Sequence, residues 1–212
     1  MLLNSKEFRN STKFLRNEYD CVGYYNMPKI KKQDINLSNI KLISYSDTYS
    51  NDNEINKSKG VHFFIDDKRF EGIYINPEKS LKKLSQYSFL ISIDYSLFQE
   101  MPKALQVFNI FRSRWVAAYW QSKGLVVIPC VSWSDVLSYD FCFCGIEKES
   151  IVAVGMIGCK GNKQSFLRGY NKMLEVLNPK VIIVFGDPFD EMKGNIVRVN
   201  YIESRKVNRD GR

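Results

Sequence analysis

Short apolar runs alternate with polar loops along most of the chain. Several runs consist almost wholly of apolar residues, such as LVVIPCV at 125–131 and VIIVF at 181–185. Strands of this kind are buried on both faces, which favours parallel pairing. Pro129 has no amide hydrogen and predicts an edge or a bulge at the end of its strand. The runs predict strands at 40–45, 61–65, 89–93, 125–131, 139–146, 151–156, 181–185 and 196–201.

Three segments between these runs show the apolar spacing of helices. The longest covers 102–123 and is followed by Gly124, a natural stop. A second covers 162–177 with Asn162 as N-cap, and a short one opens at Pro77. The alternation predicts an α/β fold, a single domain with a largely parallel or mixed sheet flanked by helices. An open sheet is favoured over a barrel, because too few βα units are present for eight repeats.

The segment before residue 61 differs from the rest. It is rich in Asn, Ser and Lys, and its stretch 46–59 is mostly polar. We therefore expect an irregular N-terminal extension at 1–60, an α/β domain at 61–203 and a charged tail at 204–212.

Composition and charge indicate the cellular location of the protein and the class of partner it binds. The 212 residues carry 31 Lys+Arg against 23 Asp+Glu, a net charge of +8, which favours anionic partners such as nucleic acid or nucleotides. The five cysteines are odd in number and have no disulfide-framework spacing, which indicates a reducing, cytoplasmic location. No apolar stretch approaches the roughly 20 residues that span a bilayer, and the first residues are too polar for a signal peptide. No membrane association is expected.

A glycine-rich loop between a strand and a helix is the first candidate site. In IVAVGMIGCKGNKQSF, residues 151–166, the loop residues Gly158, Lys160, Gly161, Asn162 and Lys163 precede a helix. Free amides at a helix N-terminus attract anions, and the two lysines add charge. The loop is neither a Walker A loop nor a dinucleotide fingerprint. It is predicted to bind a phosphate, with a tight turn as the alternative.

Aromatic and basic residues on the longest helix are the second candidate. Arg112 and Trp115 share one side of the helix, whereas Arg114 faces elsewhere. A guanidinium beside an indole can stack on a base or clamp a phosphate, and Trp133 follows the next strand. Core packing is the alternative for this aromatic stripe.

Carboxylates at strand ends are the third candidate. Ligands of parallel α/β proteins bind beyond the carboxyl ends of the strands, where Asp94, Asp135, Asp140 and Asp187 are expected. Such carboxylates can hold Mg²⁺ for phosphate chemistry, and capping is the alternative. Asp94 is the best candidate for catalysis, and Mg²⁺ is the one cofactor considered.

Cysteine chemistry is not expected. In YDFCFC, Asp140, Cys142 and Cys144 would share one face of the predicted strand, but their spacing does not match the usual zinc sites. The one histidine, His62, has no sequence link to a cysteine, so neither a metal site nor a cysteine–histidine pair is predicted.

Three linked motifs resemble a known family. They are RWVAAYWQSKGLVVIPCVSWS, FCFCGIEKESIVAVGMIGC and PKVIIVFG, and the likeness covers about residues 60–203. The chain resembles a bacterial domain family of unknown function carried by phages, plasmids and integrative mobile elements of Gram-positive hosts. The resemblance implies a mobile-element setting and brings no established activity.

Three functions remain open. The first is a phage or mobile-element protein that binds a phosphate-bearing ligand, nucleic acid or nucleotide, at the carboxyl ends of the strands. The second is a metal-dependent phosphodiester or phosphoryl enzyme, and the third is a host-directed interaction protein, such as a counter-defence factor with a host protein as its partner.

Overall fold

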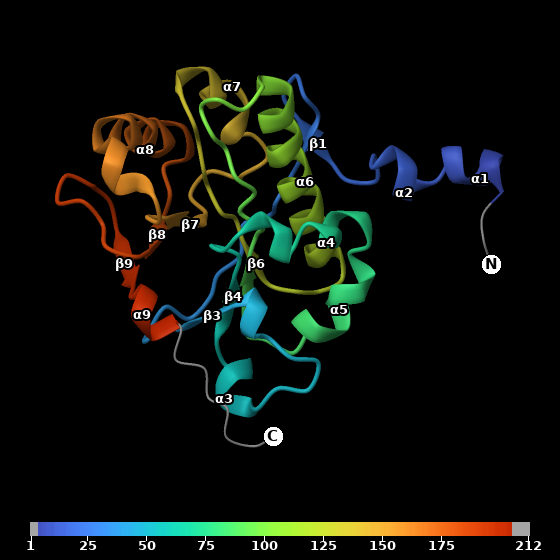
Figure 1. The fold of residues 1–212 in the computed structure, drawn as a ribbon, viewed down its shortest axis with the longest axis horizontal. Coiled ribbons are helices and arrows are strands. Elements are labelled where there is room, and N and C mark those ends of the chain that lie inside the picture. Colours follow the sequence, from blue (N-terminus) through green and yellow to red (C-terminus); the bar gives the residue numbers. More distant parts are fainter. Residues whose placement is uncertain (1–3, 205–212) are drawn as a thin grey trace.

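Parallel strands pair in the same order as they occur along the chain (Figure 1). The computed structural model describes residues 4–204, apart from the side chains of Lys160 and Glu203. Four strands form one sheet in the order β3-β4-β5-β6, and three form another in the order β7-β8-β9. They are β3 (Leu42–Ser44), β4 (Gly60–His62), β5 (Phe89–Ile91), β6 (Val127–Ile128), β7 (Ile151–Gly155), β8 (Val181–Phe185) and β9 (Ile196–Val199).

A parallel bridge between Cys130 and Ala153 joins the two sheets. The amide of Val131 donates to the carbonyl of Ala153 at 2.8 Å, and the amide of Ala153 donates to the carbonyl of Pro129 at 2.9 Å. Regular strand β6 stops at Ile128 because Pro129 has no amide hydrogen to continue the ladder. The proline therefore interrupts an inner strand and does not place that strand at an edge.

The joined sheet is curled. The rings of His62 on β4 and Phe185 on β8 lie 4.4 Å apart, although strands four places apart in a flat sheet would be separated by about 19 Å. No ladder pairs β9 with β3 in residues 4–204, so the sheet is open, as predicted. Side chains of the strands, and of residues that directly follow β4 and β6, meet in one inner core: Leu42, Phe64, Phe89, Ile91, Ile128, Cys130, Ile151, Ala153, Val181, Ile183, Phe185 and Val199.

Helices cover the outer face of the sheet. Val116 and Trp120 of α6 pack with Val127 of β6, and Tyr170 and Met173 of α8 pack with the outward residues of β7 and β8. The helices of this layer are α4 (Gly72–Ile75), α5 (Glu78–Leu84), α6 (Lys103–Ser122), α7 (Tyr139–Cys142) and α8 (Lys163–Leu177), whereas α3 (Glu54–Lys57) lies below the sheet in Figure 1. The 3₁₀ turns within residues 4–204 are η1 (Tyr45–Asp47), η2 (Asp67–Arg69), η3 (Val136–Ser138) and η4 (Cys159–Asn162).

The predicted α/β fold is confirmed, and one predicted strand is wrong. Residues 139–146 contain helix α7, which follows η3, and the side chain of Asp135 caps η3 by accepting from the amide of Ser138. The carbonyls of Cys142 and Cys144 accept hydrogen bonds from Arg114 and are not available to a sheet ladder. Asp140, Cys142 and Cys144 therefore do not form a common strand face.

Part of the expected N-terminal extension belongs to the α/β domain. β3 lies before residue 61 and pairs with β4 along its whole length. Met27 and Ile30 are fully buried in the core. Met27 lies in the small antiparallel pair of β1 (Cys21–Val22) and β2 (Met27–Pro28). A domain that begins at residue 61 would therefore divide one sheet.

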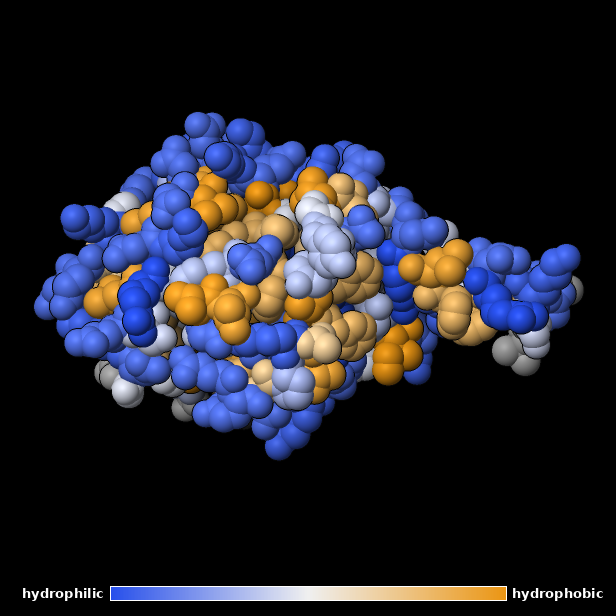
Figure 2. Space-filling model, turned by 90° about the horizontal axis from the view of Figure 1, so that it is seen from above, coloured by the Kyte–Doolittle hydropathy of each residue, from blue (hydrophilic) through white to orange (hydrophobic). Residues whose placement is uncertain are grey.

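The first two helices stand apart from this body. α1 (Ser5–Arg9) and α2 (Thr12–Leu15) form the projection at the right of Figures 1 and 2. Phe8, Phe14 and Leu15 are exposed there. At the other end of the chain, α9 (Tyr201–Ser204) follows β9 and lies against β3. The predicted charged tail lies outside the described residues from position 205 onward.

Candidate functional site

Loops that follow β5, β6 and β7 meet at the carboxyl edge of the sheet. The side-chain amide of Gln99, after β5, lies 3.4 Å from both the carbonyl of Ser134, after β6, and the hydroxyl of Ser165 in α8. Three of the strand ends expected to gather therefore do so. We call Asp94, Asp67, Ser96, Ser132 and the loop 158–163 the edge site.

Asp94 is the most perturbed carboxyl of the edge site. It follows β5 and is only partly exposed. The pKa of Asp94 is raised to about 6, mainly by burial and also by the nearby charge of Asp67, although hydrogen bonds from the Cys130 thiol and the Ser132 hydroxyl act to lower it. A carboxyl with a pKa near neutrality can donate or accept a proton, which is a property of functional sites.

A second carboxylate fixes the loop after β5. Asp67 follows β4, and its carboxylate accepts from the amide of Ser96 at 3.1 Å and from its hydroxyl at 2.9 Å. Both carboxylates therefore lie at the ends of neighbouring strands. They form the acidic side of the edge site.

The glycine-rich loop forms the opposite side of the edge site. Gly158 has φ +79°, a conformation that favours glycine, and a Cβ atom added at Gly158 or Gly161 would meet nothing within 4 Å. No side chain caps the first turn of α8. The charge of Asp94 raises the pKa of Cys159, next to burial as the main cause, which places this loop near Asp94.

The polar residues of this loop differ in whether their side chains already have partners in the protein. Asn162 is the N-cap of α8 by position but makes no capping bond through its side chain. The ammonium of Lys163 forms an ion pair with Glu191 at 2.7 Å. The side chain of Lys160 lies outside the described part of the structure. An anion bound here would rely first on backbone amides, as at other helix N-termini.

The two arginines of α6 have separate partners and do not act together at the edge site. Arg112 forms an ion pair with Glu71 and lies over the ring of Tyr95, 3.6 Å from its centroid. Arg114 is 1% exposed and donates to the carbonyls of Cys130, Cys142 and Cys144 at 2.7–3.2 Å. Its guanidinium joins α6, β6 and α7, and burial leaves it no surface for a ligand.

The two tryptophans pack into the protein. Trp115 is 2% exposed, and its indole donates to Glu18 at 3.3 Å. Trp133 is half-buried and packs on Phe166 of α8, with centroids 5.1 Å apart. The core-packing alternative therefore describes Trp115, whereas Trp133 borders the edge site through the loop after β6.

The other predicted acids are engaged elsewhere. Asp135 accepts from Lys103 at 2.6 Å and caps η3, Asp187 pairs with Arg198, and Asp140 is exposed on α7. No group of three or more His, Cys, Asp or Glu side chains in residues 4–204 is arranged to hold a metal ion. Of the acids proposed from the sequence, Asp94 alone lies at the edge site.

The cysteines behave as small apolar residues. All five are free thiols, and Cys130 and Cys142 are buried. Burial raises the pKa of Cys159 to about 11, so its thiol stays protonated near neutral pH. A thiol in that state is a poor nucleophile.

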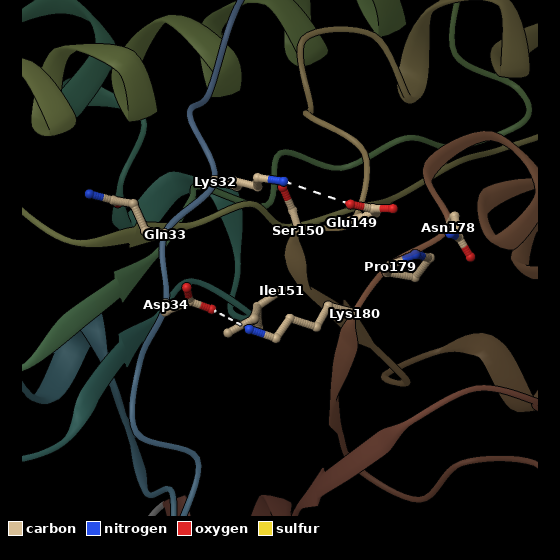
Figure 3. Close-up of a pocket in the computed structure, with 9 residues that line it drawn as sticks. All are labelled: Lys32, Gln33, Asp34, Glu149, Ser150, Ile151, Asn178, Pro179 and Lys180. Carbon is tan, nitrogen blue, oxygen red and sulfur yellow. Dashed lines mark hydrogen bonds and ion pairs between the residues drawn. The ribbon is translucent and has the colours of Figure 1, made fainter.

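A hollow of about 500 Å³ lies at the opposite, amino ends of β7 and β8 (Figure 3). Lys180 pairs there with Asp34 at 2.8 Å, and Lys32 pairs with Glu149 at 3.8 Å. All four side chains are exposed, so each pair contributes little to stability. The pairs attach the segment before β3 to the loops before β7 and β8.

Sequence reasoning missed two residues at the carboxyl ends. Asp67 and Ser132 were not proposed, although each follows a predicted strand within a few residues. The positional rule that selected Asp94 would have found them. His62 was considered only as a partner for a cysteine, and its surroundings are described below.

Replacing Asp94 with asparagine is expected to stabilise the protein at pH 7.5. The carboxyl has a pKa of about 6 in the fold and about 3.9 when unfolded, so its ionisation costs the folded state as much as about 3 kcal/mol. This penalty is fully present above pH 6 and disappears below about pH 4. Urea unfolding at pH 7.5 and 4.5 measures the difference.

Asp135 provides the matched control. Lys103 holds the pKa of its carboxyl below the usual range, so Asp135→Asn should destabilise at pH 7.5. Loss of stability by Asp94→Asn at both pH values would show that the Asp94 carboxylate has a structural role.

Residues 19–203 match the family described as Domain of unknown function (DUF4417). The chain belongs to this family. It is similar to the Gene 1 protein of Mycobacterium phage L5, with 33% identity over 175 residues that cover 81% of this chain and 76% of the relative. It is also similar to the Gene 1 protein of Mycobacterium phage D29, with 36% identity over 129 residues that cover 59% of this chain and 48% of the relative. No solved structure matches the chain.

Family membership confirms the resemblance drawn from the three motifs, and both relatives are phage proteins. The chain spans about half the length of the second relative. The family match begins at residue 19 and includes β1 to β3, in agreement with the pairing of β3 and β4. No helix between residues 4 and 204 is long and apolar enough to cross a bilayer.

Proposed function

We propose that this protein binds a phosphate-bearing ligand, a nucleotide or nucleic acid, at the edge site. The observation that carries the proposal is that Asp94 and the glycine-rich loop meet at one edge of the sheet. Phosphate oxygens would accept from the amides at the N-terminus of α8, and Asp94 would face the sugar or the attacking group. The net charge of +8 supports an anionic ligand.

The geometry of the loop suits a phosphate group. α8 has 15 residues, so its N-terminus carries the positive end of a helix dipole, and the 3₁₀ turn η4 leads directly into it. Gly161 has open space beside it and no positive φ, so neither packing nor backbone strain requires glycine there. Close approach of a ligand to the backbone would require it.

The proposal is tested by titrating the protein with ligands at two salt concentrations. Inorganic phosphate, adenosine 5′-monophosphate and a short single-stranded DNA are the probes, with thermal shift as readout. Affinity for the DNA should fall as salt rises, because phosphate contacts release counterions. A ligand at one hundred times its dissociation constant should stabilise the fold by about 2.7 kcal/mol.

Gly161→Val should abolish this binding without lowering the melting temperature. Gly72→Val is the matched control, because Gly72 in α4 also has open space beside it and a φ that other residues accept. An affinity that does not change with salt concentration, or binding that is retained in Gly161→Val, would rule out the loop as the phosphate site.

A metal-dependent phosphodiester or phosphoryl enzyme is the second candidate. The neighbouring charges of Asp94 and Asp67 support it, since a bound cation would relieve their repulsion. Repeating the DNA titration with Mg²⁺ tests this function: cleavage that requires the ion and is lost in Asp94→Asn would favour it. A host-directed role stays a prediction.

A further inference from the structure

A cavity of about 240 Å³ opens over the carboxyl ends of β3 and β4. It borders the end of β7, because Phe64 in its wall lies against Gly155, and Tyr201 and Ser204 of α9 line one side of it. We call it the His62 cavity. Its walls include Ser44, Asp47, His62, Phe64, Arg69 and Tyr201.

His62 presents a hydrogen-bond donor that has no acceptor. The amide of Phe64 donates to Nδ1 of His62 at 3.3 Å. A neutral imidazole carries one hydrogen, so Nε2 must carry it. The side chain is 2% exposed, and Nε2 has no hydrogen-bond partner among the residues that the structure describes. Buried donors are nearly always satisfied in folded proteins, so this one calls for an acceptor from outside the chain.

Aromatic rings surround the imidazole. His62 lies 4.4 Å from Phe185 and 5.7 Å from Phe64, measured between ring centroids. Phe185 also contacts Phe64 at 4.9 Å and Tyr201 at 5.6 Å. Of these rings, His62, Phe64 and Tyr201 line the cavity, and they suit a flat, apolar ligand surface. The cavity volume lies below the roughly 300–1,000 Å³ of drug-sized sites, so the ligand is small.

Hydrogen-bond donors and acceptors both lie around the rings. The hydroxyl of Ser44 accepts from the amide of Ser46 at 3.2 Å, which leaves its hydrogen to donate. Arg69 supplies further donors and Asp47 supplies acceptors. A matching ligand must therefore be compact and flat and must carry both acceptors and donors at its rim.

We propose that the His62 cavity binds a single nucleobase, with a carbonyl oxygen or ring nitrogen of the base accepting from Nε2 of His62. A purine or pyrimidine combines a flat ring with acceptors and donors on one small frame. The proposal does not depend on a phosphate at the edge site, because a free base carries none.

Imidazole NMR tests the proposal directly. The sequence contains one histidine, so every imidazole signal of the ¹⁵N-labelled protein belongs to His62. Adenine, guanine, cytosine and uracil are titrated separately, with inorganic phosphate as the control. At least one free base should shift the Nε2–H resonance and raise the melting temperature, and phosphate should leave that resonance unchanged.

Two substitutions separate the donor from the rest of the ring. His62→Gln places an amide N–H near the position of Nε2 and should keep binding within a few-fold. His62→Asn keeps a group near Nδ1 but removes the donor, and should weaken binding roughly tenfold.

The spectrum of the wild-type protein tests base binding at His62 even if both variants fold poorly. An Nε2–H resonance that no free base moves would overturn the proposal, as would binding of a base that leaves the resonance unchanged. If phosphate binds, no free base binds and the Nε2–H resonance of His62 does not move, the result would support the edge site and overturn the proposal for the His62 cavity.

Discussion

Arg114→Ala is expected to lower the free energy of unfolding by at least about 4 kcal/mol, and the variant should be largely unfolded or insoluble at 25 °C. The substitution removes a fully buried side chain and leaves the carbonyls of Cys130, Cys142 and Cys144 without their donor. Each buried group left unsatisfied costs about 1–3 kcal/mol, and the cavity adds to this cost. Urea unfolding followed by tryptophan fluorescence measures it.

Two further variants define the cause. Arg114→Lys keeps the charge, but a single ammonium cannot reach three carbonyls that a planar guanidinium spans, so it should also be strongly destabilised. Arg112→Ala, two residues away on α6, should cost only about 1–2 kcal/mol, since its ion-pair partner Glu71 is half exposed. Similar losses for Arg112→Ala and Arg114→Ala would contradict a special role for Arg114.

The second large effect is a loss of stability on acidification that originates at His62. Burial lowers the pKa of His62 to about 3, whereas an unfolded histidine has a pKa of about 6.5. Below pH 6.5 the unfolded chain binds a proton that the folded chain does not. The free energy of unfolding should therefore fall by up to about 1.4 kcal/mol per pH unit between pH 6.5 and 4.5.

Asp94 opposes this trend in the wild type. Its folded pKa is raised, so its contribution to stability grows as the pH falls from about 6 to 4. The Asp94→Asn background removes that contribution and should show the full His62 slope, and adding His62→Gln should flatten it. The imidazole should remain neutral at pH 4.5 by NMR, and a titration midpoint near 6.5 would contradict the buried environment.

Local patterns predicted the regular elements well. The runs at 151–156 and 181–185 became β7 and β8, and the helices expected at 102–123 and 162–177 became α6 and α8, each within a residue or two at either end. These segments are long and strongly apolar on the buried side, so their local preference and their packing agree. The segment 139–146 failed because its carbonyls bind a guanidinium from a distant helix, which no local pattern reveals.

The candidate sites were predictable to different degrees. Asp94 and the glycine-rich loop follow apolar runs, and the rule for parallel sheets placed both at one edge. The His62 cavity depends on the curl of the sheet, which brings β4 against β8 across long stretches of sequence. Arg114 shows the same limit: its three acceptors come from two separate segments, and their meeting is a property of the tertiary structure.

The agreement between strand order and chain order has a consequence for synthesis. Each strand from β4 to β9 pairs with a strand that precedes it in the chain. As the chain leaves the ribosome, the pairing partner of each new strand has already been synthesised. The sheet can therefore grow in one direction from β3. A chain released before β8 would lack strands at only one edge, but it would expose the inner core that those strands cover. Incomplete chains should therefore be recognised by chaperones and proteases through that core.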